Sequence, residues 1–129
     1  QTRKIPLLWS LHLAYGFLIL GFAWMAFEGA GSIPVHLIAV GGISFMILAM
    51  ISRVSLGHSG RPMELPGVFV VAYLAIIASA LIRATANLSV ENYGLLLWLA
   101  AAGWTLGFGL FVFYYLPILL SPRPDGRPG

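Results

Sequence analysis

Residues 36–62 read HLIAVGGISFMILAMISRVSLGHSGRP, a long apolar run that ends in polar residues. The run that follows His36 is apolar and carries no charge before Arg53, and a helix of roughly 20 such residues crosses a bilayer. A compact polar string, RVSLGHSGRP over residues 53–62, closes the run. The stretch therefore predicts a transmembrane helix with a candidate functional site at its end.

The composition of the whole chain is that of an integral membrane protein. Of the 129 residues, 60% are hydrophobic and 9% are charged, whereas a soluble domain carries about 25% charged residues. The absence of cysteine excludes disulfides, thiolate metal ligands and cysteine nucleophiles. A net charge of +3 does not indicate nucleic-acid binding, because the basic residues lie at the ends of the apolar stretches.

Four stretches are apolar over a membrane-spanning length. We expect helices over about 5–27, 33–56, 65–86 and 93–120, because none shows the alternation of a membrane β-strand. The predicted fold class is an all-α integral membrane protein, with four transmembrane helices in an up-down bundle within residues 1–122. We expect Ser32 to be the N-cap of the second helix, and the proline-rich tail over 123–129 to be disordered and cytoplasmic.

The distribution of charge predicts the orientation. Four spans place both termini and the loop after the second span on one side, together with six of the seven basic residues. By the positive-inside rule this side is the cytoplasm. Arg83, the basic residue of the other side, is expected to pair with Glu28 or Glu91.

Gly103 and Gly107 form a GxxxG motif in the fourth span. Small residues at this spacing allow close approach of helices inside a bilayer, where no hydrophobic effect drives helices together. Two interpretations stay open, namely close packing inside the bundle and contact with another membrane subunit through these two glycines.

Three histidines, His12, His36 and His58, are the candidate metal or haem ligands. His12 lies about 10 Å inside the first helix, a depth at which a histidine needs a partner. As an alternative, His12 hydrogen-bonds to a serine or carbonyl of a neighbouring helix. His36 and His58 have the alternative of being ordinary interfacial histidines.

Depth limits which histidines can share one metal. His36 and His58 are 22 residues apart, roughly 33 Å of helix, and His36 also differs in depth from His12. His12 and His58 lie near the same side, so they can form a bis-imidazole site if the segment 56–60 folds inward. With Arg53, Ser59 and Arg61, His58 forms a cationic pocket that suits a haem propionate, a lipid headgroup or a carboxylate of a partner.

The same residues resemble the NnrS family of bacterial membrane proteins. The resemblance lies in His36, Gly41-Gly42, MILAM over 46–50 and above all RVSLGHSGR over 53–61, and extends to Leu11-His12-Leu13 and Tyr15. It implies the C-terminal portion of a longer polytopic protein in the bacterial inner membrane, which fits a chain that starts at Gln1 without methionine. It further implies bound haem b, copper or both, with His12, His36 and His58 as ligands, and a link to nitric oxide and denitrification stress.

Two functional interpretations follow. In the first, the chain is a haem- or metal-binding membrane protein of the NnrS type that serves the response to nitric oxide or nitrogen oxides. We expect binding rather than turnover, because the glutamates Glu28, Glu64 and Glu91 all lie in loops. In the second, the chain is a structural or anchoring transmembrane subunit of a larger respiratory or photosynthetic complex, in which the histidines only pack or form hydrogen bonds.

Overall fold

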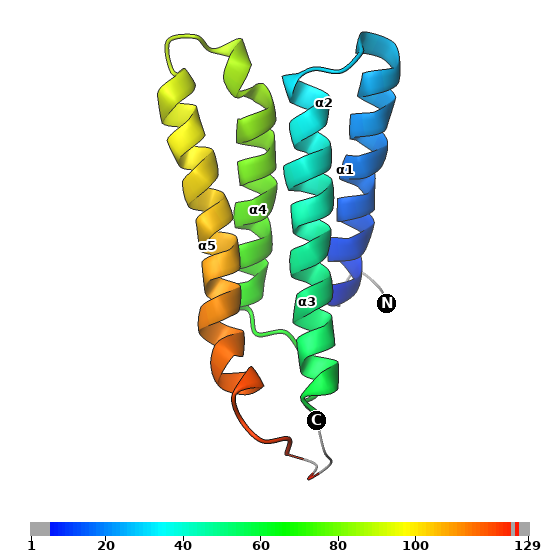
Figure 1. The fold of residues 1–129 in the computed structure, drawn as a ribbon, viewed down its shortest axis with the longest axis vertical. Helices are drawn as coiled ribbons and strands as arrows, with labels where there is room; N and C mark the ends of the chain where they lie inside the picture. The colour runs from blue at the N-terminus through cyan, green and yellow to red at the C-terminus, as the bar shows by residue number, and fades with distance from the viewer. Residues whose placement is uncertain (1–5, 125, 127–129) are drawn as a thin grey trace.

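The computed structural model describes residues 6–124 and 126, and over these residues the chain is helical without strands. Four helices are long and apolar enough to cross a membrane, and they run up and down side by side (Figure 1). The predicted fold class is therefore confirmed. Most of the tail predicted over 123–129 lies outside the described residues, as do Arg3, Lys4 and Arg127.

The second span is the irregular one. The first span is α1 (Pro6–Glu28), whereas the second consists of α2 (Ser32–His36), a π-helix η2 (Leu37–Ser44) and α3 (Phe45–His58). The third span is α4 (Val68–Thr85) with a 3₁₀ turn η3 (Ala86–Leu88), and the fourth is α5 (Tyr93–Leu119). A π-helix of eight residues is rare, and such segments frequently mark functional sites.

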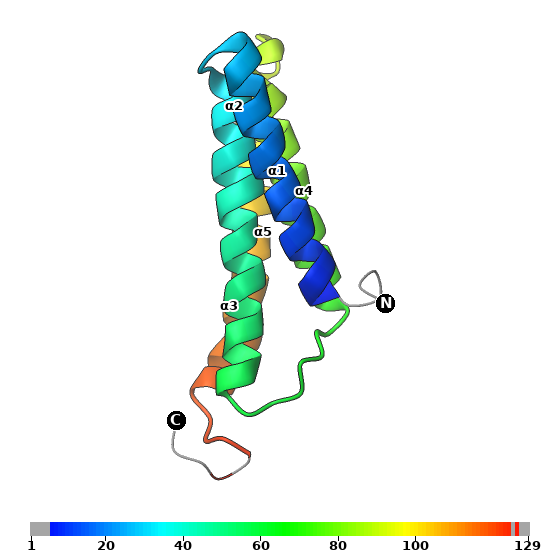
Figure 2. The same ribbon diagram turned by 90° about the vertical axis from the view of Figure 1, so that its right-hand side faces the viewer.

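The four spans are not level with one another. At the end where α3 finishes, α3 and α5 extend beyond α1 and α4 (Figure 2). The loop 59–67 therefore runs back along the bundle to reach the start of α4. At the opposite end, α2 begins beside the end of α4 (Figure 1). Residues near the start of α2 and near the end of α4 are therefore neighbours.

The aromatic core centres on Tyr73 of α4. Its ring meets Trp9 of α1 and Phe45 of α3 edge to face, with centroid separations of 5.9 and 5.4 Å. Phe69 extends the cluster to Tyr115 of α5, at 5.1 Å. These edge-to-face pairs link all four spans through one continuous set of rings.

Glycines set the closest helix contacts. A Cβ added at Gly41 would lie 2.5 Å from the Phe17 side chain, so α1 lies almost directly on η2. In α5, Gly103 and Gly107 face α4, where an added Cβ would lie 3.0 Å from the Ala75 carbonyl and 3.1 Å from the Ala72 carbonyl. The GxxxG motif thus serves packing inside the bundle. Since α4 lies against both glycines, the structure favours the first of the two interpretations, and contact with another subunit stays a prediction.

The two ends of the second span differ from one another. The N-cap of α2 is Gly31, without a side-chain cap, so the predicted N-cap role of Ser32 is wrong. Ser32 is instead the first residue of the helix, with Oγ 3.3 Å from His36 Nδ1. At the other end Gly60 has φ +67°, and Arg61 N–H donates to Leu56 O at 3.1 Å. This is a Schellman motif, which requires a residue with positive φ at Gly60.

Candidate functional site

His36 has one ring nitrogen engaged and the other free. Nδ1–H donates to the Ser32 carbonyl at 2.7 Å, within the single turn of α2. Because a carbonyl only accepts, this bond places the proton on Nδ1 and leaves the Nε2 lone pair available. His36 is half-buried and makes no hydrogen bond through Nε2 to any described residue.

His36 lines a cavity of about 390 Å³ between the second span, α4 and α5. Its walls are almost entirely apolar. The lining residues come from all three spans: His36, Val40, Ser79, Arg83, Leu97, Ala100, Ala101 and Trp104. Ser79 Oγ donates to the Ala100 carbonyl at 2.6 Å and so fixes α4 to α5 at this wall. A cavity of this size is within the range of small-molecule sites, roughly 300–1,000 Å³.

Arg83 shares the cavity with His36. Its Nη1 is buried and has no hydrogen-bond partner among the described residues. The predicted pairing with Glu28 or Glu91 is wrong, since both carboxylates are exposed and neither bonds to Arg83 in the described chain. The proximity of Arg83 to His36 was not predicted from the sequence. It could have been inferred, because each residue lies about one turn from the same end of two antiparallel spans.

His12 lies on an exposed face of α1. Its Nδ1–H donates to the Leu8 carbonyl of the same helix at 2.7 Å, so the alternative of a bond to a neighbouring helix is not what the structure shows. Around it is an open groove formed by α1 alone, lined by Leu11, His12, Tyr15, Gly16 and Ile19. As in His36, Nε2 is free and faces away from the helix backbone.

His58 is the last residue of α3 and is exposed. It lines a cavity of about 440 Å³ with Ser59 and Arg123. Arg123 Nη1 donates to the His58 carbonyl at 3.0 Å, and Ser59 Oγ donates to the Leu56 carbonyl at 3.1 Å. The helix continues to His58, so the inward fold of 56–60 that a site shared with His12 needs is not present here.

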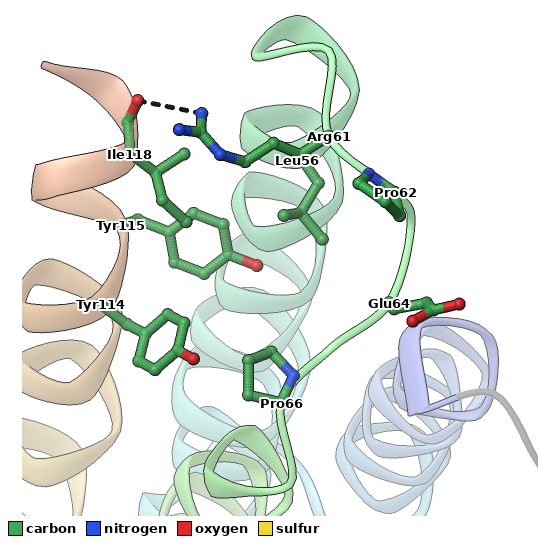
Figure 3. A pocket seen from close by; sticks show the side chains of 8 residues that line it. All are labelled: Leu56, Arg61, Pro62, Glu64, Pro66, Tyr114, Tyr115 and Ile118. Carbon is green, nitrogen blue, oxygen red and sulfur yellow. Dashed lines mark hydrogen bonds between the residues drawn. The ribbon is translucent and has the colours of Figure 1, made fainter. Parts of the chain in front are cut away.

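Arg61 belongs to a different cavity from His58. Figure 3 shows its guanidinium reaching α5, where Nη1 donates to the Ile118 carbonyl at 3.4 Å. The cavity has a volume of about 250 Å³ and includes Tyr114 and Tyr115. Arg53 is exposed on α3 and lines neither cavity. The four residues of the predicted cationic pocket are thus spread over two cavities and a helix surface.

The three histidines lie along three separate cavities. Over residues 6–124 and 126, no group of three His, Asp or Glu side chains is placed to hold a metal ion. Each imidazole could therefore supply one nitrogen ligand to a metal in its own cavity. Any further ligands of that metal would have to be groups other than these His, Asp and Glu side chains. The pairing of His12 with His58 stays a prediction.

A buried hydroxyl cluster was not predicted from the sequence. Ser10, Ser52, Tyr73 and Tyr115 come from four different spans and are all at most 1% exposed. Ser52 lies beside both phenols but donates to the Leu48 carbonyl at 2.7 Å. Ser10 Oγ and both phenol oxygens lack a partner with hydrogen-bond geometry in the described residues. No linear motif brings these four residues together, since they are scattered over more than 100 positions.

Comparison with known proteins gives one family. The sequence profile of the family described as NnrS protein matches residues 1–123, which is nearly the whole chain. No curated protein and no solved structure matches. Four helices of membrane-spanning length and the extent of this match lead to one conclusion: the chain belongs to the NnrS protein family.

Proposed function

We propose that this protein binds haem b, copper or both through His12, His36 and His58, and that it serves the response to nitric oxide or nitrogen oxides. We place it in the bacterial inner membrane with both termini in the cytoplasm. The membership in the NnrS family supports the class of protein, and the positive charges around the predicted termini support the orientation.

The proposal rests on the hydrogen bonds of His12 and His36, the two histidines that lie within the membrane-spanning helices. Both His12 and His36 donate Nδ1–H to a carbonyl of their own helix at 2.7 Å, which leaves both Nε2 atoms free. Metal-binding histidines are oriented in this way by a second hydrogen bond that fixes the tautomer. Imidazole nitrogen suits copper and haem iron, so the donor set fits the proposed groups.

His58 differs from the other two histidines. Its side chain is exposed at the end of α3, so it has access to a ligand from the cavity beside Arg123. The propionate-binding role of Arg53 and Arg61 is part of the same proposal, with Arg61 held at the Ile118 carbonyl. When bound, a haem iron or a copper ion would supply the atom that coordinates nitric oxide, and the protein would supply imidazoles and an apolar surround.

A reduced-minus-oxidised absorption spectrum with metal analysis on the same detergent-purified sample tests the proposal. We expect a b-type haem signal or stoichiometric copper. Substitution of a true ligand, His12→Ala, His36→Ala or His58→Ala, should abolish that signal while circular dichroism stays unchanged. Tyr15→Phe beside His12 is the matched control and should keep it. A protein without haem and metal, purified from cells supplied with both, contradicts the proposal.

The alternative, a structural or anchoring subunit of a larger complex, has one observation in its favour. The imidazole of His12 lies on an exposed face of α1, next to Tyr15, which is 61% exposed. A polar ring facing hydrocarbon is unfavourable, which favours a protein that covers this face. Native electrophoresis of membranes extracted in mild detergent should then show a larger complex that His12→Ala or Tyr15→Ala weakens, without any chromophore.

A further inference from the structure

We propose that the cavity between the second span, α4 and α5 binds the phosphate headgroup of an anionic membrane lipid, with Arg83 as the residue that binds the phosphate. This proposal goes beyond the metal site and does not depend on it. It rests on three features of the cavity, namely an unpaired positive charge, its position toward one end of the bundle and its apolar walls.

The charge of Arg83 lacks a counter-charge. Nη1 is buried without a hydrogen-bond partner in the described residues, and the cavity walls include no carboxylate. A buried guanidinium nitrogen without an acceptor is unfavourable in a low-dielectric region, so a ligand with an acceptor oxygen is favoured beside Nη1. A phosphate offers several such oxygens and pairs with the two-pronged guanidinium through charge-assisted bonds.

The cavity lies toward one end of the bundle. Arg83 is followed by two α-helical and three 3₁₀ residues, so it lies about 9 Å from the end of the third span. His36 lies four residues, about 6 Å, from the start of the second span at the same end. From this position the long side chain of Arg83 can extend toward the headgroups of the adjacent leaflet.

The walls fit the chain that follows a headgroup. Val40, Leu97 and Ala100 provide an aliphatic surface, and Trp104 lies further along α5. The two small residues Ala100 and Ala101 leave room between the larger side chains. Because His36 and Arg83 lie toward one end of the cavity and the deeper hydroxyl of Ser79 is bonded to the Ala100 carbonyl, the remaining lining is apolar and fits an amphiphile better than a water-soluble anion.

His36 lies in the same cavity as Arg83. The guanidinium attracts a phosphate or another acid. When no metal is bound to it, His36 Nε2 can accept a hydrogen bond from a headgroup hydroxyl, such as the glycerol of phosphatidylglycerol. Phosphatidylglycerol is therefore the probe of choice, with diacylglycerol of the same acyl chains as its phosphate-free counterpart.

Native mass spectrometry of the full chain in non-ionic detergent tests this directly. We expect the wild-type protein to retain phosphatidylglycerol about tenfold more strongly than diacylglycerol, as one charge-assisted pair predicts. Arg83→Gln should remove that preference and Arg83→Lys should keep most of it. Thr85→Val is the matched control on the same helix, because Thr85 is exposed and bonds only within α4.

Each contrary outcome is distinct. Equal retention of the two lipids by the wild-type protein overturns the proposal, and so does an unchanged preference in Arg83→Gln. Retention of oleate in place of phosphatidylglycerol would identify a fatty carboxylate and overturn the phosphate assignment. If Arg83→Gln lowers haem content while lipid retention is unchanged, Arg83 binds a propionate instead. A sample that retains phosphatidylglycerol but contains no metal contradicts the proposed function alone.

Discussion

At the scale of single residues, the ring and the hydroxyl of Tyr115 have different surroundings. The side chain is 1% exposed and its phenol oxygen has no partner with hydrogen-bond geometry in the described residues. Its ring, by contrast, stacks on Phe111 at 4.7 Å and meets Phe69 edge to face. The ring therefore contributes to packing, while the hydroxyl carries an uncompensated desolvation cost.

We predict that Tyr115→Phe leaves the free energy of unfolding unchanged or raises it by up to about 1 kcal/mol, because it removes a buried group without a partner. Thermal unfolding in detergent measures this, with the exposed Tyr114→Phe as the control. A loss of about 1 kcal/mol or more in Tyr115→Phe would contradict the prediction and indicate a bound water in the hydroxyl cluster.

Gly107 gives the opposite case, a residue whose missing side chain is needed. We predict that Gly107→Leu lowers the free energy of unfolding by about 2 kcal/mol, because the new side chain would overlap Ile76 and the Ala72 carbonyl. Gly109 has nothing within 4 Å of an added Cβ, so Gly109→Leu should be tolerated. Equal effects of the two variants in a thermal unfolding series would refute the assignment of the motif to the α4–α5 contact.

The sequence predicted single residues of the candidate site, but not that His36 and Arg83 line the same cavity. His36 and Arg83 were each placed near the outer ends of their spans from sequence position alone. Their meeting depends on the rotation of α4 about its axis, which the third span does not specify because it is apolar on most of its surface. Glu28 and Glu91, chosen as partners by charge, are both exposed; Glu91 lies in the loop before α5, but Glu28 is the last residue of α1, so its predicted position in a loop is wrong. Charge complementarity between loop and helix was therefore the wrong criterion.

At the scale of elements, the second span differs from its prediction in its type of helix. A continuous helix over 33–56 was predicted, and the structure has an α–π–α sequence over residues 32–58. Helix propensity does not distinguish the wider π turn, because its stability comes from tertiary contacts. Here Gly41 and Gly42 bring the backbone of η2 against Phe17 and Leu18 of α1.

Gly57 and Gly60, near the end of α3, are expected to respond in opposite ways to substitution by alanine. Gly60→Ala should lower the free energy of unfolding by about 1 kcal/mol, because φ +67° places the new Cβ against the following carbonyl. Gly57→Ala, three residues earlier inside the helix, should raise it by about 0.5 kcal/mol, since open space surrounds it and alanine favours the helix. Chemical denaturation of the two variants side by side decides this, and a reversed order would exclude the Schellman motif.

At the scale of the whole molecule, the fold class was readable from the sequence for a physical reason. Inside a bilayer every backbone N–H and C=O group must be bonded within the protein, so long apolar stretches without alternation leave only helices. Length and hydropathy then give four spans, as observed. The bundle geometry needed more, because each apolar helix is similar on all its faces and the seams are set by small residues such as Gly41 and Gly107.

The proposed orientation can be tested because the chain has no cysteine. We expect Val90→Cys, in the exposed loop between α4 and α5, to react with a membrane-impermeant maleimide in intact spheroplasts. Met63→Cys, in the exposed loop after α3, should react only after permeabilisation. Both variants should be labelled after detergent treatment, which serves as the control. Labelling of Met63→Cys in intact spheroplasts would reverse the orientation.

The reciprocal bonds between α3 and α5 have a consequence for how the molecule opens. Arg61, which follows α3, bonds to a carbonyl in the last turn of α5, and Arg123, which follows α5, bonds to the final residue of α3. Unwinding of either terminus breaks a bond that holds the other, so the two helix ends should fray together. A ligand that holds one of them in place would then slow amide exchange in both, although they are more than 50 residues apart in the chain.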